Sequence, residues 1–328
     1  MRKELGIAVL LVVLCAVTAS LNRAFISSVN LTNMANVIGM FGIFSLGLGL
    51  VIITGGIDLS VGSMFALTGV LLAMALTEWH WPWPVAAALA VAIPMLLGWA
   101  HGALITRMRI QPFIITLCGL LIYRGLARFV AQDGTKGFGN AEGFETFRDL
   151  AKGKLFGLPM PFVLLLIISV IMWFVLHRSI YGRYLLAVGR NEEATRFSGV
   201  NTRLVIASSY IVAGLLTGIS GILFAFYTNS VSPSTHGNFY ELYGIAAAVL
   251  GGCSLRGGEG SVLGILIGTA LLQVLQNLVN LLGIPSSLNF AVMGAVVLIG
   301  VLADQFFQGR SARKLVRSPA AGAVRAAS

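Results

Sequence analysis

The chain has 328 residues, of which 57% are hydrophobic and only 10% are charged. Soluble domains carry about 25% charged residues, so this composition excludes an ordinary soluble domain and predicts a multi-pass membrane protein. The formal net charge of +10 does not indicate a nucleic-acid-binding protein, because the basic residues are scattered singly through short polar connections.

Apolar runs of about 20 residues predict transmembrane helices, and this chain contains enough of them for an all-α bundle of about ten. The predicted spans are residues 5–21, 37–54, 61–76, 85–105, 113–131, 161–176, 204–226, 242–252, 262–282 and 288–303. The eighth is the shortest. Residues 1–309 are expected to form one transmembrane domain. Residues 310–328 are basic, lack an apolar period and are expected to form a disordered cytoplasmic tail that lies near lipid headgroups.

An even number of spans places both termini on one side of the membrane, and the basic residues predict which side. The segments on the side of the termini carry fifteen Lys and Arg, namely Arg2, Lys3, Arg107, Arg109, Arg178, Arg183, Arg190, Arg196, Arg203, Arg256, Arg310, Arg313, Lys314, Arg317 and Arg325. The opposite segments carry five, namely Arg23, Lys136, Arg148, Lys152 and Lys154. Both termini are therefore expected in the cytoplasm. The alternative is a signal peptide cleaved after a Val17-x-Ala19 site, which would leave nine spans.

The sequence contains no motif that would hold a metal, a nucleotide or a catalytic nucleophile. It has no GxxxxGK[ST] phosphate-binding loop and no HExxH zinc motif, and its four histidines are far apart. The three cysteines lie in apolar segments or beside glycines and lack CxxC spacing. We therefore expect no metal site, no cofactor and no catalytic residue in this chain.

The polar sequence GGIDLSVGS begins at Gly55 and interrupts the apolar run between residues 37 and 76. An Asp at the centre of a spanning helix costs roughly 2.5–3.5 kcal/mol, so Asp58 requires a physical reason. Gly55 and Gly56 allow a turn with positive φ, and Asp58 or Ser60 is expected to cap the third span. The alternative is that this interruption forms part of a gate lined by discontinuous helices.

The fifth span leads into one sizeable external segment, residues 132–159. Arg124 and Arg128 lie one helical turn apart near the outer end of that span and are expected to extend towards the headgroups. The glycines, charges and short length of the external segment predict a lid or a docking surface instead of a domain.

The ninth span carries a stripe of amides on one helical face. They are Gln273, Gln276, Asn277 and Asn280, at i, i+3, i+4 and i+7. One interpretation is hydrogen bonding between helices. The other is a hydrated path for an uncharged, hydroxyl-bearing solute, because amides both donate and accept hydrogen bonds.

The longest internal connection reads GRYLLAVGRNEEATRFSGVNTR. Glu192, Glu193 and Ala194 are expected to open a short helix with Asn191 as its N-cap, and Gly199 to end it. Such a helix could be a contact site for another protein. The alternative is an ordinary solvated turn.

Four motifs in order resemble the permease subunits of ABC sugar importers of the ribose/galactose/xylose class, whose relatives include autoinducer-2 permeases. The motifs are GGIDLSVGS, TLCGLLIYRGLA, AVGRNEEATRFSGV and LGGCSLRGGEGSVLG. The internal connection is also similar to the importers' coupling pattern E-A-A-x-x-x-G, at Glu193, Ala194 and Gly199, with Thr195 in place of the second alanine.

This resemblance implies a path for a monosaccharide or similar small hydroxylated solute, formed with a second, identical or related permease chain. It implies two ATP-binding subunits, or one duplicated ATPase, bound at the coupling helix, and a periplasmic sugar-binding protein outside. ATP hydrolysis would then occur in a separate subunit. The alternative function is an ion-coupled secondary transporter or channel, for which Asp58 is the one acid well placed to relay ions.

Overall fold

The computed structural model of the protein describes residues 2–139 and 142–285, together with positions 288, 291, 292, 294, 295 and 298. Seven helices in this part of the chain are long and apolar enough to cross a membrane. They are α1 (Arg2–Leu21), α2 (Ser28–Ile53), α4 (Trp83–Met108), α5 (Pro112–Ala131), α7 (Met160–His177), α10 (Thr202–Thr228) and α12 (Val262–Leu281). Two further apolar helices are shorter, α3 (Val61–Thr77) and α11 (Tyr240–Leu250). The predicted helical, polytopic membrane protein is therefore confirmed.

Nine of the ten predicted spans correspond to these nine helices. The tenth, residues 288–303, falls mostly outside the described residues, and the tail 310–328 lies wholly outside them. The remaining helical elements are η1 (Arg23–Ile26), α6 (Glu145–Lys152), α8 (Ile180–Arg190) and α9 (Glu192–Phe197). Two small antiparallel pairs complete the described part of the chain: β1 (Lys136–Gly137) with β4 (Ser230–Val231), and β2 (Lys154–Leu155) with β3 (Leu158–Pro159).

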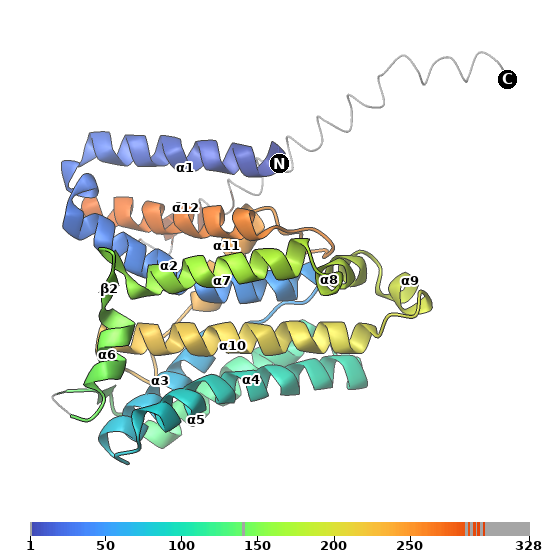
Figure 1. Ribbon diagram of the computed structural model, residues 1–328, viewed down its shortest axis with the longest axis horizontal. Helices are drawn as coiled ribbons and strands as arrows, with labels where there is room; N and C mark the ends of the chain where they lie inside the picture. The colour runs from blue at the N-terminus through green and yellow to red at the C-terminus, as the bar shows by residue number, and fades with distance from the viewer. Residues whose placement is uncertain are drawn as a thin grey trace.

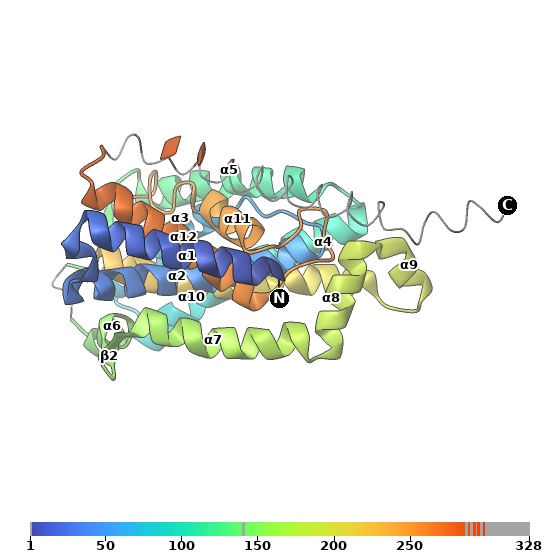
Figure 2. The same cartoon turned by 90° about the horizontal axis from the view of Figure 1, so that it is seen from above.

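The long helices run side by side, with α8 and α9 at one end of the bundle and α6 and β2 at the other (Figure 1). We call these the α9 end and the α6 end. Figure 2 shows α5 along one edge and α7 along the opposite edge, with α2 and α10 between them. Helix α2 forms the centre, because every residue from Gly39 to Ile53 is buried. Helix α1 packs on α12, and its first residues face the α9 end.

Small residues allow α4 and α10 to pack closely. Each helix has a GxxxG spacing, Gly98/Gly102 in α4 and Gly214/Gly218 in α10. A Cβ added at Gly98 would overlap the Tyr210 carbonyl of α10, and one added at Gly214 would overlap the Pro94 carbonyl of α4. These two helices share the most extensive contact between elements.

Helix α3 does not begin at the α9 end, where α2 stops, but deep inside the bundle. Residues 54–60 run inward without helical structure. The carbonyl of Ile57 accepts from Thr116 of α5 and from Tyr210 of α10, and the carbonyl of Gly62 accepts from Arg124, near the middle of α5. The third span is therefore discontinuous: a short non-helical segment, residues 54–60, leads to a helix of 17 residues that begins inside the bundle.

Helix α11 also begins inside the bundle, and for this reason we call α3 and α11 the half-helices. After β4 at the α6 end, residues 232–239 lead inward to Tyr240, where α11 begins beside the start of α3. From there α11 and residues 251–261 return to the α9 end, where Gly258 N donates to the Ile53 carbonyl at 2.8 Å. Its 11 residues, about 1.5 Å each, are too few to cross a hydrocarbon core alone.

Candidate functional site at the meeting of two half-helices

The first turns of α3 and α11 meet at Gly62 and Glu241. A Cβ added at Gly62 would overlap the Gly237 carbonyl and the Glu241 carboxylate. Glu241 is buried, and its carboxylate lies beside the Gly62 backbone. Helix N-termini carry partial positive charge, so the first turns of both helices stabilise this carboxylate. Only glycine at position 62 leaves room for this arrangement.

Arg124 connects three segments at this point. Its Nη1 donates to the carbonyls of Pro233 (3.1 Å) and His236 (2.8 Å), and its Nη2 donates to the Gly62 carbonyl (3.1 Å). The guanidinium therefore holds α5, the start of α3 and residues 232–239 together. The prediction that Arg124 extends to the headgroups is wrong, because its side chain turns into the bundle. Arg128 is exposed and pairs with Asp133 at 2.6 Å.

Asp58 is buried in the non-helical segment, residues 54–60, that leads from the α9 end to the start of α3. Its Oδ1 accepts from the Ser60 backbone N (2.9 Å) and from the Ser60 hydroxyl (2.6 Å). Ser60 directly precedes α3 but makes no capping bond with its side chain, so the expected Ser60 cap does not form. Asp58 orders the approach to the helix and bonds to no N–H of its first turn. Gly55 has the positive φ (+83°) that its expected turn requires, and Gly56 is buried against the Tyr210 hydroxyl.

Histidine and tyrosine side chains surround Asp58. Tyr123 and His101 share a hydrogen bond of 2.7 Å, and both, with Tyr210, lie close enough to Asp58 to interact with its charge. His101 is buried. The His236 ring is also buried, and its Nε2 has no hydrogen-bond partner within the described residues. The interior at the two half-helices is thus polar on several sides.

At the α9 end, three backbone segments meet with almost no side chains between them. Gly189 of α8 lies so close to Ile53 and Gly258 that an added Cβ would overlap backbone atoms of both. A Cβ on Gly257 would lie 2.7 Å from the Gly189 carbonyl and 2.9 Å from Gly55 N. We call these five residues the glycine junction. It connects α8 to the segments that lead into α3 and out of α11.

Helix α9 projects beyond the ends of the long helices (Figures 1 and 2). It begins with the expected N-cap, because Asn191 Oδ1 accepts from Ala194 N at 2.9 Å. Gly199 follows its last turn with φ of +86°. Both acids of the first turn, Glu192 and Glu193, are exposed, as is Ala194. Phe197, which sequence reasoning did not single out, is 78% exposed.

The amide stripe of α12 does not face a single environment. Gln273 is buried, Gln276 and Asn277 are half-buried, and Asn280 is exposed. Asn277 exchanges two hydrogen bonds with Asn30 of α2, at 3.1 and 2.8 Å. Its amide therefore joins two helices. No group of three or more potential metal-ligating side chains occurs among the described residues.

Comparison with known proteins identifies the family. Residues 30–301 match the family model described as "Branched-chain amino acid transport system / permease component". The ribose import permease protein RbsC of Bacillus subtilis (strain 168) is 38% identical over 313 residues, covering 92% of this chain and 93% of the relative. RbsC of Escherichia coli (strain K12) is 38% identical, and the match covers 90% of this chain and 91% of the relative. The fructose import permease protein FrcC of Rhizobium meliloti is 30% identical, and the match covers 92% of this chain and 84% of the relative.

No solved structure matches this chain. The family model and the relatives each cover most of the chain, and the helical bundle agrees with a polytopic permease. ATP hydrolysis in this family belongs to a separate subunit, and the permease works with ATPase and binding-protein partners. The chain therefore belongs to the permease components of bacterial ABC importers and is a multi-pass protein of the inner membrane.

Proposed function

We propose that the chain forms the translocation path for a monosaccharide or a similar small hydroxylated solute. The observation that carries this proposal is its similarity, along nearly the whole chain, to permeases named for ribose, and at 30% identity to one named for fructose. A galactofuranose permease, YtfT of Escherichia coli (strain K12), is 32% identical. Ribose, fructose and galactofuranose are all small polyhydroxylated sugars.

The proposed topology has ten spans, with the α9 end in the cytoplasm and both termini there. The first residues of α1 face that end, and so do the arginines of α8 and of its flanks, including Arg178 and Arg190. The α6 end would then face the periplasm and receive the sugar-binding protein. Residues 288–303 would supply the tenth span.

For the partners, we propose a second permease chain, identical or related, and two ATP-binding subunits or one duplicated ATPase. The contact for the ATPase would be α9, with Glu192, Glu193 and Ala194 on its surface, Gly199 setting its end and Phe197 as an apolar anchor. A short helix that projects from the bundle and exposes a large aromatic side chain favours a protein contact.

The gate would lie where α3 and α11 meet, with Gly55, Gly56, Asp58 and Ser60 forming its approach from the cytoplasm. Discontinuous helices are the usual sites of solute binding and gating in transporters. Movement of α9 would reach both half-helices through the glycine junction. Of the amide stripe, Gln273, Gln276 and Asn280 remain available to line the path, whereas Asn277 is bonded to Asn30.

The direct test is purification of the tagged chain from native membranes under gentle conditions, with its partners identified by mass spectrometry. An ATPase subunit and a sugar-binding protein should be recovered, and the sugar released from the binding protein names the cargo. Recovery of the chain without any ATPase would contradict the proposal.

Replacing Phe197 by Ala is expected to reduce ATPase recovery at least tenfold, since losing a buried aromatic anchor commonly costs 2 kcal/mol or more, and about 1.4 kcal/mol is a factor of ten. Phe156→Ala is the matched control. Phe156 is 96% exposed, but it lies in the β2–β3 hairpin at the opposite end. Equal recovery from both variants would reject α9 as the ATPase contact.

Asp58→Asn is expected to retain at least half of wild-type uptake, because an amide oxygen can accept the same bonds from Ser60 N and Oγ. Asp58→Leu, which has similar size and no acceptor, should lose most uptake, since two buried donors lose their partner. Uptake of labelled sugar, normalised to the amount of chain in the membrane, measures both. Complete loss in a stably inserted Asp58→Asn chain would show that the charge itself is required.

A further inference from the structure

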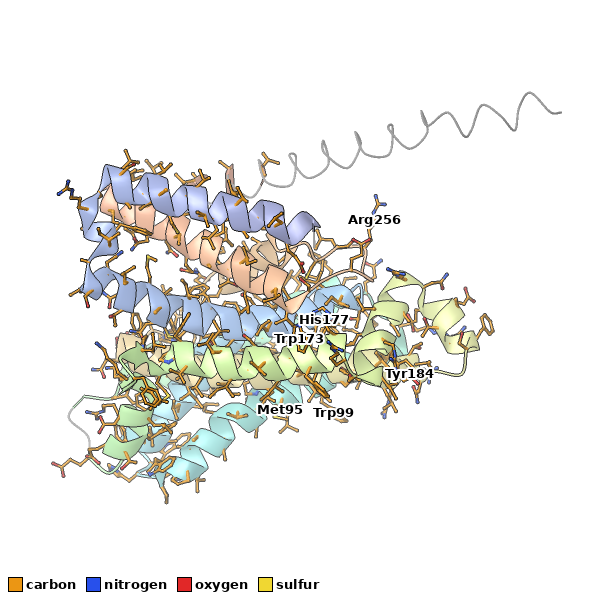
Figure 3. The ribbon with its side chains drawn as sticks, turned by 45° about the horizontal axis from the view of Figure 1, so that its top comes forward. Met95, Trp99, Trp173, His177, Tyr184 and Arg256 are labelled. Carbon is orange, nitrogen blue, oxygen red and sulfur yellow. The ribbon has the colours of Figure 1, made fainter. Side chains whose placement is uncertain are left out.

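A cavity of about 650 Å³ lies near the α9 end, on the outer surface of the bundle between α4, α8 and α10. Its walls include Trp99 and Arg107 of α4, Tyr181 of α8, and Arg203 and Ser208 of α10. The half-helices and the glycine junction contribute nothing to this cavity. Figure 3 shows Trp99 on α4 and Tyr184 on α8, near the end where α9 projects.

The polarity of this cavity changes along the bundle. Arg107 lies in the last turn of α4 and Arg203 in the first turn of α10, so both guanidiniums belong to the α9 end. Both are exposed, and neither forms an ion pair or a hydrogen bond with any described residue. Trp99 and Ile211 lie about two turns deeper and supply apolar surface. The cavity is therefore cationic at the membrane surface and apolar towards the membrane interior.

Other polar groups border the charged end of this cavity. Arg203 lies in the first turn of α10, where the helix dipole carries partial positive charge, and the Glu192 carboxylate accepts from the Thr202 hydroxyl of the same turn at 3.1 Å. The Ser208 hydroxyl donates to the Val205 carbonyl at 2.9 Å, and the Tyr181 hydroxyl donates to Ser208 Oγ at 2.8 Å, so both hydroxyl hydrogens are already used. Guanidinium groups are strong hydrogen-bond donors to phosphate, so Arg107 and Arg203 are the groups that would bind an anion here.

We propose that this cavity is a binding site for one anionic phospholipid of the cytoplasmic leaflet, such as phosphatidylglycerol. Its phosphate would lie between Arg107 and Arg203, and an acyl chain would lie along Trp99 and Ile211. Basic pockets between spanning helices on the cytoplasmic side bind anionic headgroups in this way, and tryptophan is common at the same depth. The proposal rests on the cytoplasmic orientation of the α9 end proposed above.

The test is native mass spectrometry of the full-length chain, released from nanodiscs that contain equal amounts of phosphatidylcholine and phosphatidylglycerol. The wild-type chain should retain one phosphatidylglycerol preferentially. An Arg107→Gln/Arg203→Gln variant should lose this preference by roughly tenfold or more. Arg178→Gln/Arg183→Gln, which removes the same charge from the same end but outside the cavity, should retain it.

Equal retention of phosphatidylglycerol by the two double variants, or no preference over phosphatidylcholine in the wild type, would overturn the proposal. Displacement by added inorganic phosphate would overturn the lipid assignment in favour of a free anion. A wild-type dimer that binds no lipid, and dissociates in the Arg107/Arg203 variant, would assign the cavity to the second permease chain instead. Lipid retention does not require transport, so a chain that binds phosphatidylglycerol without importing sugar would reject only the proposed function.

Discussion

An Arg124→Met chain is expected to lose sugar uptake roughly 100-fold or more while still reaching the membrane. The guanidinium donates to three buried backbone carbonyls. One of them belongs to the start of α3 and two belong to residues 232–239. An unsatisfied buried polar group costs about 1–3 kcal/mol, and about 1.4 kcal/mol corresponds to a factor of ten. Losing two of these bonds is therefore sufficient for the expected effect.

Arg128→Met is the matched control, because it removes the same side chain one helical turn away. Arg128 is exposed and contacts only the exposed Asp133 among the described residues, and surface ion pairs contribute about 0–1 kcal/mol. Uptake and thermal stability of Arg128→Met should therefore remain close to wild type. Arg124→Lys should recover little, because a single ammonium group lacks the planar fork that reaches three acceptors. Uptake by Arg124→Met within twofold of Arg128→Met would contradict the role of Arg124.

Gly189→Ala is expected to separate ATP hydrolysis from transport. Its methyl group would overlap backbone atoms of Ile53 and Gly258, which cannot rotate away as a side chain can. Overpacking of this kind costs about 1–3 kcal/mol and would push α8 away from the segments that lead to both half-helices. The complex should still assemble and hydrolyse ATP, because α9 itself is unchanged, but its movement would no longer reach the gate.

Gly125→Ala is the control for this exchange. Gly125 also lies in a helix, but a Cβ there would meet no atom within 4 Å, so uptake should be unchanged. ATP hydrolysis and uptake are measured on the same preparation of each variant. If Gly189→Ala imports sugar as fast as Gly125→Ala, the glycine junction does not carry the coupling.

The sequence was sufficient to predict the features that depend on near neighbours. The spans follow from apolar runs, and α9 follows from a cap whose donor is three residues away. For the third span, the sequence left a discontinuous helix as one of two interpretations. Glycines and one acid in an apolar run favour a break in the helix, but they do not show how deep in the bundle the break lies.

The role of Arg124 could not be predicted, because its partners are remote along the chain. Gly62, Pro233 and His236 are 62, 109 and 112 residues away, and nothing local indicates that these segments meet. One signal was present. Arg124 lies in the middle of a 20-residue helix, which is deep for a side chain that is to extend to the surface. The hydrogen bond between Asn30 and Asn277 joins residues 247 positions apart, so it could not be predicted either.

We propose that this chain moves a sugar across the membrane only when a separate ATPase drives it. The most direct test is to reconstitute the chain into liposomes with the ATPase and the binding protein that co-purify with it, and to measure uptake of the labelled sugar that this binding protein carries. Accumulation of the sugar should require all three proteins and ATP. Accumulation by the chain alone, driven by a proton or sodium gradient, would contradict it.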